Sequence, residues 1–264
     1  EDILGERVSG GCVIDKAGGT LELARTEVVW GAHPVPDAEC ARGCRRIREL
    51  ASDLTERDLV FTMCGNGVSA LLTQPAESIS LEELRAMTYL MQIERGAPTK
   101  DLIPVRNHLD QMKGGQFSRY LQPARCIHLY AFHVPKSYQE MLYEPHFRWL
   151  HTLPDDTTYA TAIASLKKWD AWEFVSQGIR NELLRQDRRG ATFPVADFEK
   201  TNARTFFIMP EVLGMVPTAR EKARQMGLDA HILFNGYKMT AEASQVGKVS
   251  SGVALTCHEI SEPF

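Results

Sequence analysis

Residues 58–72, DLVFTMCGNGVSALL, predict the element around which the chain is organised. A short apolar, β-prone run at 59–63 leads through a glycine-asparagine-glycine turn into a helical segment that opens at Ser69. A run of this kind between polar and glycine-rich segments is typical of a central strand in a parallel sheet. A strand that ends in glycines before a helix exposes backbone N–H groups that suit a phosphate or a carboxylate. We therefore expect an anion-binding turn here, with a plain tight turn as the alternative.

Length and composition describe an ordinary globular chain. Of its 264 residues, 44% are hydrophobic and 24% charged, which is enough to bury a substantial core. A net charge of -4 with scattered basic residues gives no electrostatic footprint for nucleic acid or an anionic membrane. No segment has the apolar length of a membrane span, and the first residues lack the pattern of a signal peptide. We expect a cytoplasmic protein with neither nucleic acid nor membrane as a partner.

The six cysteines are dispersed along the chain, which predicts reduced thiols and no disulfide framework. Cys40 and Cys44 lie one helical turn apart. Because the sequence has no second pair of cysteines or histidines that would complete a set of four ligands with them, we expect no zinc site.

Strand and helix patterns alternate along the chain. Strands are predicted at 11–15, 27–30, 59–63, 125–134, 204–209 and 230–234. Helices are predicted at 38–54, 69–72, 81–91, 101–112, 158–169, 171–186, 218–226 and 240–259, and Ser80 with Glu83 forms a capping box before the third. Such alternation implies an α/β fold with a mostly parallel sheet and helices on both faces. No linker or internal repeat is evident, so we expect one domain over residues 1–264.

Lys113 is a candidate functional residue at the end of the predicted helix 101–112, directly before two glycines. A lysine in this place is also a favourable partner for a helix C-terminus, which is the simpler interpretation.

The histidines differ in what the pattern predicts for them. In the strand 125–134, alternation places His128 on a face with other core-type residues, so we expect a hydrogen-bonded core histidine. His133 lies near the C-terminal end of that strand, where parallel sheets bind ligands, and is the better candidate for a site. His146 and His151 follow in an aromatic-rich segment, where they could line a pocket or fill one.

Five motifs in this order and spacing resemble the glycerate 2-kinase family. They are GAHPVPD (31–37), DLVFTMCGNGVSALL (58–72), ISLEEL (79–84), RGAPTKDLIPVRNHLDQMKGG (95–115) and PDDTTYATAI (154–163). The segment 204–259 also resembles that family, with Glu242 at its acidic position. The resemblance implies that residues 1–264 form a single Rossmann-like domain of the glycerate kinase N-terminal type, without the family's extreme N-terminus and its C-terminal MOFRL domain.

The same resemblance implies an activity and a site. The domain would transfer phosphate from ATP, with magnesium, to a hydroxyl of D-glycerate or a related small hydroxy or sugar acid. Arg106 and Lys113 would hold a carboxylate or neutralise the transferring phosphate, and with His133 they are the candidate catalytic residues. The expected substrate-binding residues are His33, Gly65, Asn66, Gly67, Ser69 and Glu242. The metal ligands stay unassigned, and a homodimer is left open.

The chain departs from the family pattern at three loops. The family's Ser-Gly-Gly-Gly-Ser falls on residues 65–69, which here read GNGVS, and two family aspartates that fall within 131–136 are absent. The family's Ser-Gly-Pro-Thr falls on 149–152, where only the threonine is kept. Because phosphoryl transfer needs oxygen ligands for magnesium, a non-kinase homologue is the alternative: a lyase or isomerase of a sugar acid, or a binding subunit whose nucleotide site is filled. Acid–base groups would then come from His33, His133, Lys136 and His151.

Overall fold

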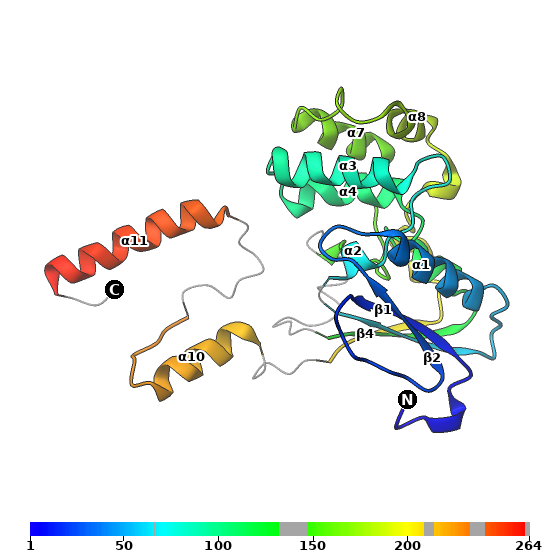
Figure 1. The fold of residues 1–264 in the computed structure, drawn as a ribbon, viewed down its shortest axis with the longest axis horizontal. Helices are drawn as coiled ribbons and strands as arrows, with labels where there is room; N and C mark the ends of the chain where they lie inside the picture. Colours follow the sequence, from blue (N-terminus) through cyan, green and yellow to red (C-terminus); the bar gives the residue numbers. More distant parts are fainter. Residues whose placement is uncertain (66, 132–146, 209–213, 233–240, 262–264) are drawn as a thin grey trace. The chain divides into compact units, whose positions relative to one another are not determined.

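The computed structural model describes residues 1–65, 67–131, 147–208, 214–232 and 241–261 (Figure 1). The chain divides into two compact units, Glu1–Leu213 and Gly214–Phe264. The strands of the first unit are β1 (Gly11–Lys16), β2 (Thr26–Gly31), β3 (Leu59–Cys64), β4 (Arg125–Tyr130) and β5 (Ala203–Phe207). Its helices of four or more residues are α1 (Ala38–Ala51), α2 (Val68–Leu71), α3 (Leu81–Tyr89), the π-helical continuation η2 (Leu90–Glu94), α4 (Thr99–Leu109), α5 (Gln116–Tyr120), α7 (Tyr159–Lys168), α8 (Gln177–Arg185) and α9 (Val195–Phe198). The expectation of one domain over residues 1–264 stays a prediction.

All strand pairs between these elements are parallel. β1 pairs with β2, and a second sheet has the order β3-β4-β5, in which Thr62 lies opposite His128 and His128 opposite Thr205. This confirms the predicted α/β class, with parallel sheets flanked by helices.

The prediction that residues 59–63 form a central strand is wrong for the described part of the sheet, where β4 is central and β3 lies at the edge. Leu59, Phe61 and Met63 are 52%, 47% and 71% exposed, whereas Thr62 and Cys64 are buried. An unbroken apolar run does not distinguish a strand buried on both faces from one buried on a single face, because only alternate side chains point into the core.

A helical layer is formed by α3, α4, α7 and α8, which lie together in Figure 1. Met87, Leu102, Leu166 and Ile179 are among the buried side chains of its core. α3 begins with the predicted capping box, because Ser80 Oγ accepts from the backbone N–H of Glu83 and the Glu83 carboxylate accepts from the backbone N–H of Ser80 at 2.7 Å.

α4 ends at Leu109, earlier than predicted. Asp110 follows it in extended conformation (φ -138°, ψ 130°), so the chain turns before Lys113. A second core then forms where α1 and α5 meet the sheets, with Cys44, Met112, Phe117 and Cys126 buried in it. This core holds the turn after α4 next to the segment that follows α2.

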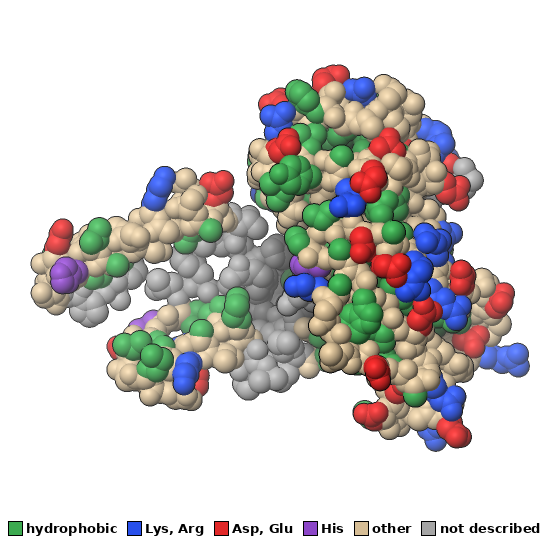
Figure 2. Space-filling model, in the orientation of Figure 1, with side chains coloured by type: hydrophobic (Ala, Val, Ile, Leu, Met, Phe, Trp, Pro, Cys, Tyr) green, Lys and Arg blue, Asp and Glu red, His purple; other side chains and the backbone are tan. Residues whose placement is uncertain are grey.

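The second unit contains α10 (Met215–Gln225) and α11 (Ala243–Ile260), neither of which has a buried residue. The predicted strand 230–234 is wrong at residues 230–232, which form no strand, and its last two residues lie outside the described residues. In the described chain no helix combines the length and the apolar character that a membrane span requires. Figure 2 shows acidic and basic side chains interspersed on the visible surface.

Candidate functional site

Three of the predicted site residues, Ser69, Arg106 and Lys113, line one small cavity of about 10 Å³. A short antiparallel contact between the segments after α2 and α4 brings them together. In it, Pro75 pairs with Asp110, and the backbone N–H of residue 111 donates to the carbonyl of residue 74 at 2.8 Å. Residues separated by some forty positions in the chain are thereby fixed around the same point.

Lys113 is fully buried and has a partner for each of its three N–H donors. Its Nζ donates to the backbone carbonyl of Leu72 and, at 3.0 Å, to Thr73 Oγ1, and it forms an ion pair with Asp110 Oδ2 at 3.0 Å. Leu72 is the C-cap residue that follows α2, so the lysine binds the end of a helix other than the one that precedes it. Burial lowers the pKa of Lys113, and the Asp110 carboxylate opposes that shift. In this arrangement Lys113 joins two turns and has no donor to spare.

Asp110 is the counter-ion that the sequence analysis missed. It accepts from the backbone N–H groups of Met112 at 2.9 Å and Gln74 at 3.2 Å, in addition to its ion pair with Lys113. Burial raises the pKa of this carboxyl, and Lys113 opposes the shift. The signal was present as an acidic residue three positions before a basic one, but the pattern alone does not reveal that both are buried.

Arg106 is the cation of the site with charge available for a ligand. It is half-buried, and its Nη2 donates to Gln92 Oε1 at 3.2 Å. Among the described residues no carboxylate lies within ion-pair distance of its guanidinium. Burial lowers the pKa of Arg106 to about 10, and Asp110 partly opposes that shift, so the side chain stays charged at neutral pH.

Ser69 and His151 form a hydrogen-bonded pair, with 3.1 Å between Ser69 Oγ and His151 Nε2. His151 is 2% exposed, and its Nδ1 is buried without a hydrogen-bond partner among the described residues. Burial, reinforced by the charges of Lys113 and Arg106, holds the pKa of His151 well below its usual value. The imidazole is therefore neutral, and it bonds to Ser69 without being one of the residues that line the cavity.

The glycine-rich turn before α2 contains Gly67, a position with little room for a side chain. Gly67 precedes α2 with φ of +90°, and a Cβ placed on it would lie 3.2 Å from the ring of His33. Val68 packs against the second core. Because α2 is a single turn, its dipole adds little to anion binding, and the role of this turn as an anion cradle stays a prediction.

For several other predicted residues, a place at this cavity stays a prediction. Asn66, His133, Lys136 and His146 lie outside the described residues. Glu242 precedes α11 in the second unit, where its carboxylate accepts from Ser244 Oγ at 3.3 Å.

His128 is confirmed as a core histidine. Its Nδ1 lies 2.8 Å from Thr62 Oγ1 and its Nε2 lies 3.4 Å from Ser118 Oγ. Burial lowers the pKa of His128 to about 4.

The donor set fits an anion better than a magnesium ion. Within the described residues, no three His, Cys, Asp or Glu side chains gather where they could hold a metal. The carboxylate of Asp110 is already paired with Lys113, which lines the cavity. The guanidinium and hydroxyl donors of Arg106 and Ser69 instead suit carboxylate or phosphate oxygens.

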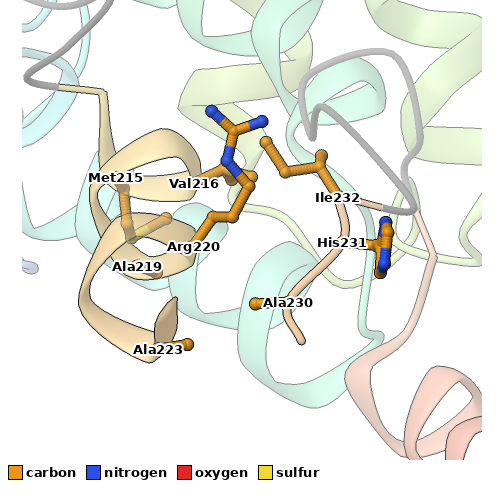
Figure 3. Close-up of a pocket in the computed structure, with 8 residues that line it drawn as sticks. All are labelled: Met215, Val216, Ala219, Arg220, Ala223, Ala230, His231 and Ile232. Atoms are coloured by element: carbon orange, nitrogen blue, oxygen red, sulfur yellow. The ribbon is translucent and has the colours of Figure 1, made fainter. Parts of the chain in front are cut away.

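A larger cavity, about 540 Å³, lies in the second unit between α10 and the loop after it (Figure 3). Its lining is mostly apolar, with Arg220 and His231 as the polar members. It contains none of the predicted site residues, so we place the candidate site in the first unit.

Comparisons with known proteins give the family of the chain and the proteins that it resembles. A family model described as a domain of unknown function, DUF4147, matches residues 1–184. The glycerate 2-kinase of Pyrococcus horikoshii is 28% identical over 264 residues, which is 100% of this chain and 57% of that protein. A putative hydroxypyruvate reductase of Agrobacterium vitis is 27% identical over 256 residues, covering 96% of this chain and 54% of that protein.

A crystal structure of a glycerate kinase from Thermotoga maritima is also similar, with a TM-score of 0.68 and 25% identity over 100% of this chain and 59% of that one. The chain thus spans little more than half the length of these relatives. The predicted resemblance to glycerate 2-kinases is confirmed, and the chain belongs to the DUF4147 family.

Proposed function

We propose that this chain carries the acid-binding site of a glycerate 2-kinase-like phosphotransferase, which acts on D-glycerate or a related small hydroxy acid with ATP. The observation that carries the proposal is the charged, half-buried Arg106 beside Ser69 at one cavity, in a chain similar to named glycerate kinases. A carboxylate is the feature that a three-carbon hydroxy acid offers to such a pair.

Arg106 is the group that would bind the substrate anion. A guanidinium presents paired N–H donors that match the two oxygens of a carboxylate, and such charge-assisted bonds are roughly twice as strong as neutral ones. The cavity of about 10 Å³ is close to the minimum that holds one water molecule. Substrate entry therefore requires a side chain to move, and Arg106, with its single bond to Gln92, is the least constrained candidate.

Lys113 and Asp110 would stabilise the turns that form the site. Their ion pair holds the turn after α4 against the segment after α2, which positions Arg106 relative to Ser69. This differs from the role first predicted for Lys113, because its three donors are already engaged.

ATP and magnesium are part of the proposal. ATP would supply the phosphoryl group, and magnesium would neutralise the charge that develops on it. The described residues supply anion donors but no set of magnesium ligands, so the residues that hold the metal are not assigned here.

The test is to incubate the full chain with ATP, magnesium chloride and D-glycerate and to follow the products by ³¹P NMR. We expect a phosphomonoester resonance with D-glycerate and none with glycerol, which lacks the carboxylate. The Arg106→Met variant should lose this product. Arg85→Met is the matched control, because Arg85 forms an exposed ion pair with Glu82 away from the cavity and its loss should leave turnover unchanged.

Parallel reactions separate the alternatives. D-glycerate binding without ATP turnover would favour a homologue that binds the acid but is no kinase. Oxidation of NADH in the presence of hydroxypyruvate would instead favour the activity named for the Agrobacterium vitis relative. Either result would contradict the kinase proposal.

A further inference from the structure

His151 differs from His128, another buried histidine of the first unit, in how its ring nitrogens are used. Both nitrogens of His128 face hydroxyl groups. At His151 only Nε2 has a partner, the hydroxyl of Ser69, and Nδ1 is buried without one among the described residues. A neutral imidazole carries a single N–H, so the side chain has two ways to place its proton.

The two tautomers have different consequences for Ser69. If Nδ1 carried the proton, a buried N–H would be left without an acceptor, and Ser69 would donate its own proton to Nε2. If Nε2 carries the proton, it donates to Ser69 Oγ, and Nδ1 is left as an unpaired acceptor. Buried N–H groups without partners are rarer than unpaired acceptors, which favours the second arrangement.

In that arrangement the hydroxyl proton of Ser69 is free. The only side-chain bond of Ser69 in the described structure is the one to His151, and Ser69 lines the cavity beside Arg106. Since no other acceptor bonds to this hydroxyl among the described residues, its proton can point toward an acceptor that enters the cavity.

We infer that His151 is a positioning residue: by donating its Nε2–H to Ser69 Oγ, it makes Ser69 a hydrogen-bond donor toward an anionic oxygen of the ligand held by Arg106. This inference rests on the proposed function for the identity of that ligand. Of the family's Ser-Gly-Pro-Thr motif, residues 149–152 keep only the threonine. His151 is therefore a feature of this chain and not part of the resemblance.

Substitutions at His151 and Ser69 test the inference. His151→Leu keeps an apolar volume in the buried position and removes the donor, whereas His151→Gln keeps an N–H that can occupy the place of Nε2. Ser69→Ala removes the hydroxyl itself, and Ser52→Ala is the matched control, because Ser52 is exposed and bonds the carbonyl of Glu49 at the end of α1. Circular dichroism and thermal unfolding of each variant confirm that it is folded.

Calorimetric titration with D-glycerate is the binding readout. We expect Ser69→Ala to weaken binding by about 10- to 100-fold, the range for loss of one hydrogen bond to a charged group. His151→Leu should weaken it by about tenfold, His151→Gln should recover most of the loss, and the double variant Ser69→Ala/His151→Leu should be no weaker than Ser69→Ala alone. Equal binding by wild type and His151→Leu, or additive losses in the double variant, would overturn the inference.

The tautomer is read independently by long-range ¹H–¹⁵N NMR of the wild-type chain, with the His151 signals assigned by their loss in His151→Gln. A protonated Nε2 and an unprotonated Nδ1 support the inference, and a protonated Nδ1 overturns it. If the wild-type chain binds neither D-glycerate nor inorganic phosphate, the proposed function fails. The spectrum then still shows which ring nitrogen of His151 carries the proton, and it alone tests the inference. The two failures are therefore distinguishable.

Discussion

Lys113 and Asp110 form an ion pair that is closed off from solvent, with 3.0 Å between Nζ and Oδ2 and side-chain exposures of 2% and 0%. Each charge lowers the cost of burying the other. Asp110 also accepts from the backbone N–H of Gln74, and Lys113 donates to the backbone carbonyl of Leu72, both in the neighbouring turn. The pair therefore fixes the shape of the site, and Lys113 lines the cavity with its donors already engaged.

Removal of one member should destabilise the chain strongly. Lys113→Met leaves a buried carboxylate without its counter-ion, and we expect the free energy of unfolding to fall by about 3–5 kcal/mol. The double variant Lys113→Met/Asp110→Asn should recover a large part of this loss, because it removes both charges and keeps an acceptor for the backbone N–H groups. Urea denaturation measures both changes.

The matched control for that pair is Lys200→Met, which breaks an exposed ion pair of similar length, 2.8 Å to Asp197. Its denaturation midpoint should stay near that of wild type because exposed pairs add little stability. A Lys113→Met variant as stable as this control would contradict the structural role of the buried pair.

Gly67 and Gly65 give a matched pair of substitutions within one turn. Gly67 has φ of +90°, and a Cβ there would meet His33, whereas a Cβ on Gly65 would meet nothing within 4 Å. We expect Gly67→Ala to lower the free energy of unfolding by about 1–3 kcal/mol, from backbone strain and displacement of the histidine ring. Gly65→Ala should cost clearly less by the same thermal or urea measurement; equal losses would show that the conformation of Gly67 is not what matters.

His128 predicts how stability depends on pH. The folded protein holds the pKa of this histidine at about 4, below the value of about 6.5 for an unfolded chain. Between these values the unfolded state binds the proton and the folded state does not, so protonation favours unfolding as the pH falls. The loss should reach roughly 3 kcal/mol by pH 4, since each pKa unit corresponds to about 1.4 kcal/mol.

The variant His128→Gln isolates this contribution. Its hydroxyl partners, Thr62 and Ser118, can still bond to an amide. Urea midpoints measured from pH 7 to pH 4 should fall less steeply in His128→Gln than in wild type. Parallel curves for the two proteins would assign the acid sensitivity to other groups.

Much of the local structure follows from the sequence because it depends on neighbouring residues. The capping box at Ser80 and Glu83 and the face that buries His128 were predicted from spacing alone. The alternation of strands and helices likewise predicted a mostly parallel sheet flanked by helices, and the described strands form two parallel sheets. Where the expectation failed, at the edge position of β3, the missing information was which strands pair, and this depends on contacts distant in the chain.

Three of the residues that line the cavity were named from the sequence, but the contacts that join them were not. Arg106, Lys113 and Ser69 were named from the sequence, and they do line one cavity. Asp110 as the partner of Lys113, and His151 as the partner of Ser69, are visible only once the turns after α2 and α4 are joined. Sequence spacing does not predict such contacts. It also does not predict burial, which here leaves Arg106, and not Lys113, with unused N–H donors.

The central claim is that Arg106 is the cation that binds the substrate's carboxylate, and calorimetric titration of D-glycerate into wild type, Arg106→Met and Arg85→Met tests it most directly. We predict binding by wild type and Arg85→Met, and a loss of about 100-fold or more in Arg106→Met, because a charge-assisted bidentate contact contributes several kcal/mol. All three proteins should unfold at similar temperatures, since neither arginine is buried with a carboxylate. D-glycerate binding of equal strength to wild type and Arg106→Met would contradict the account.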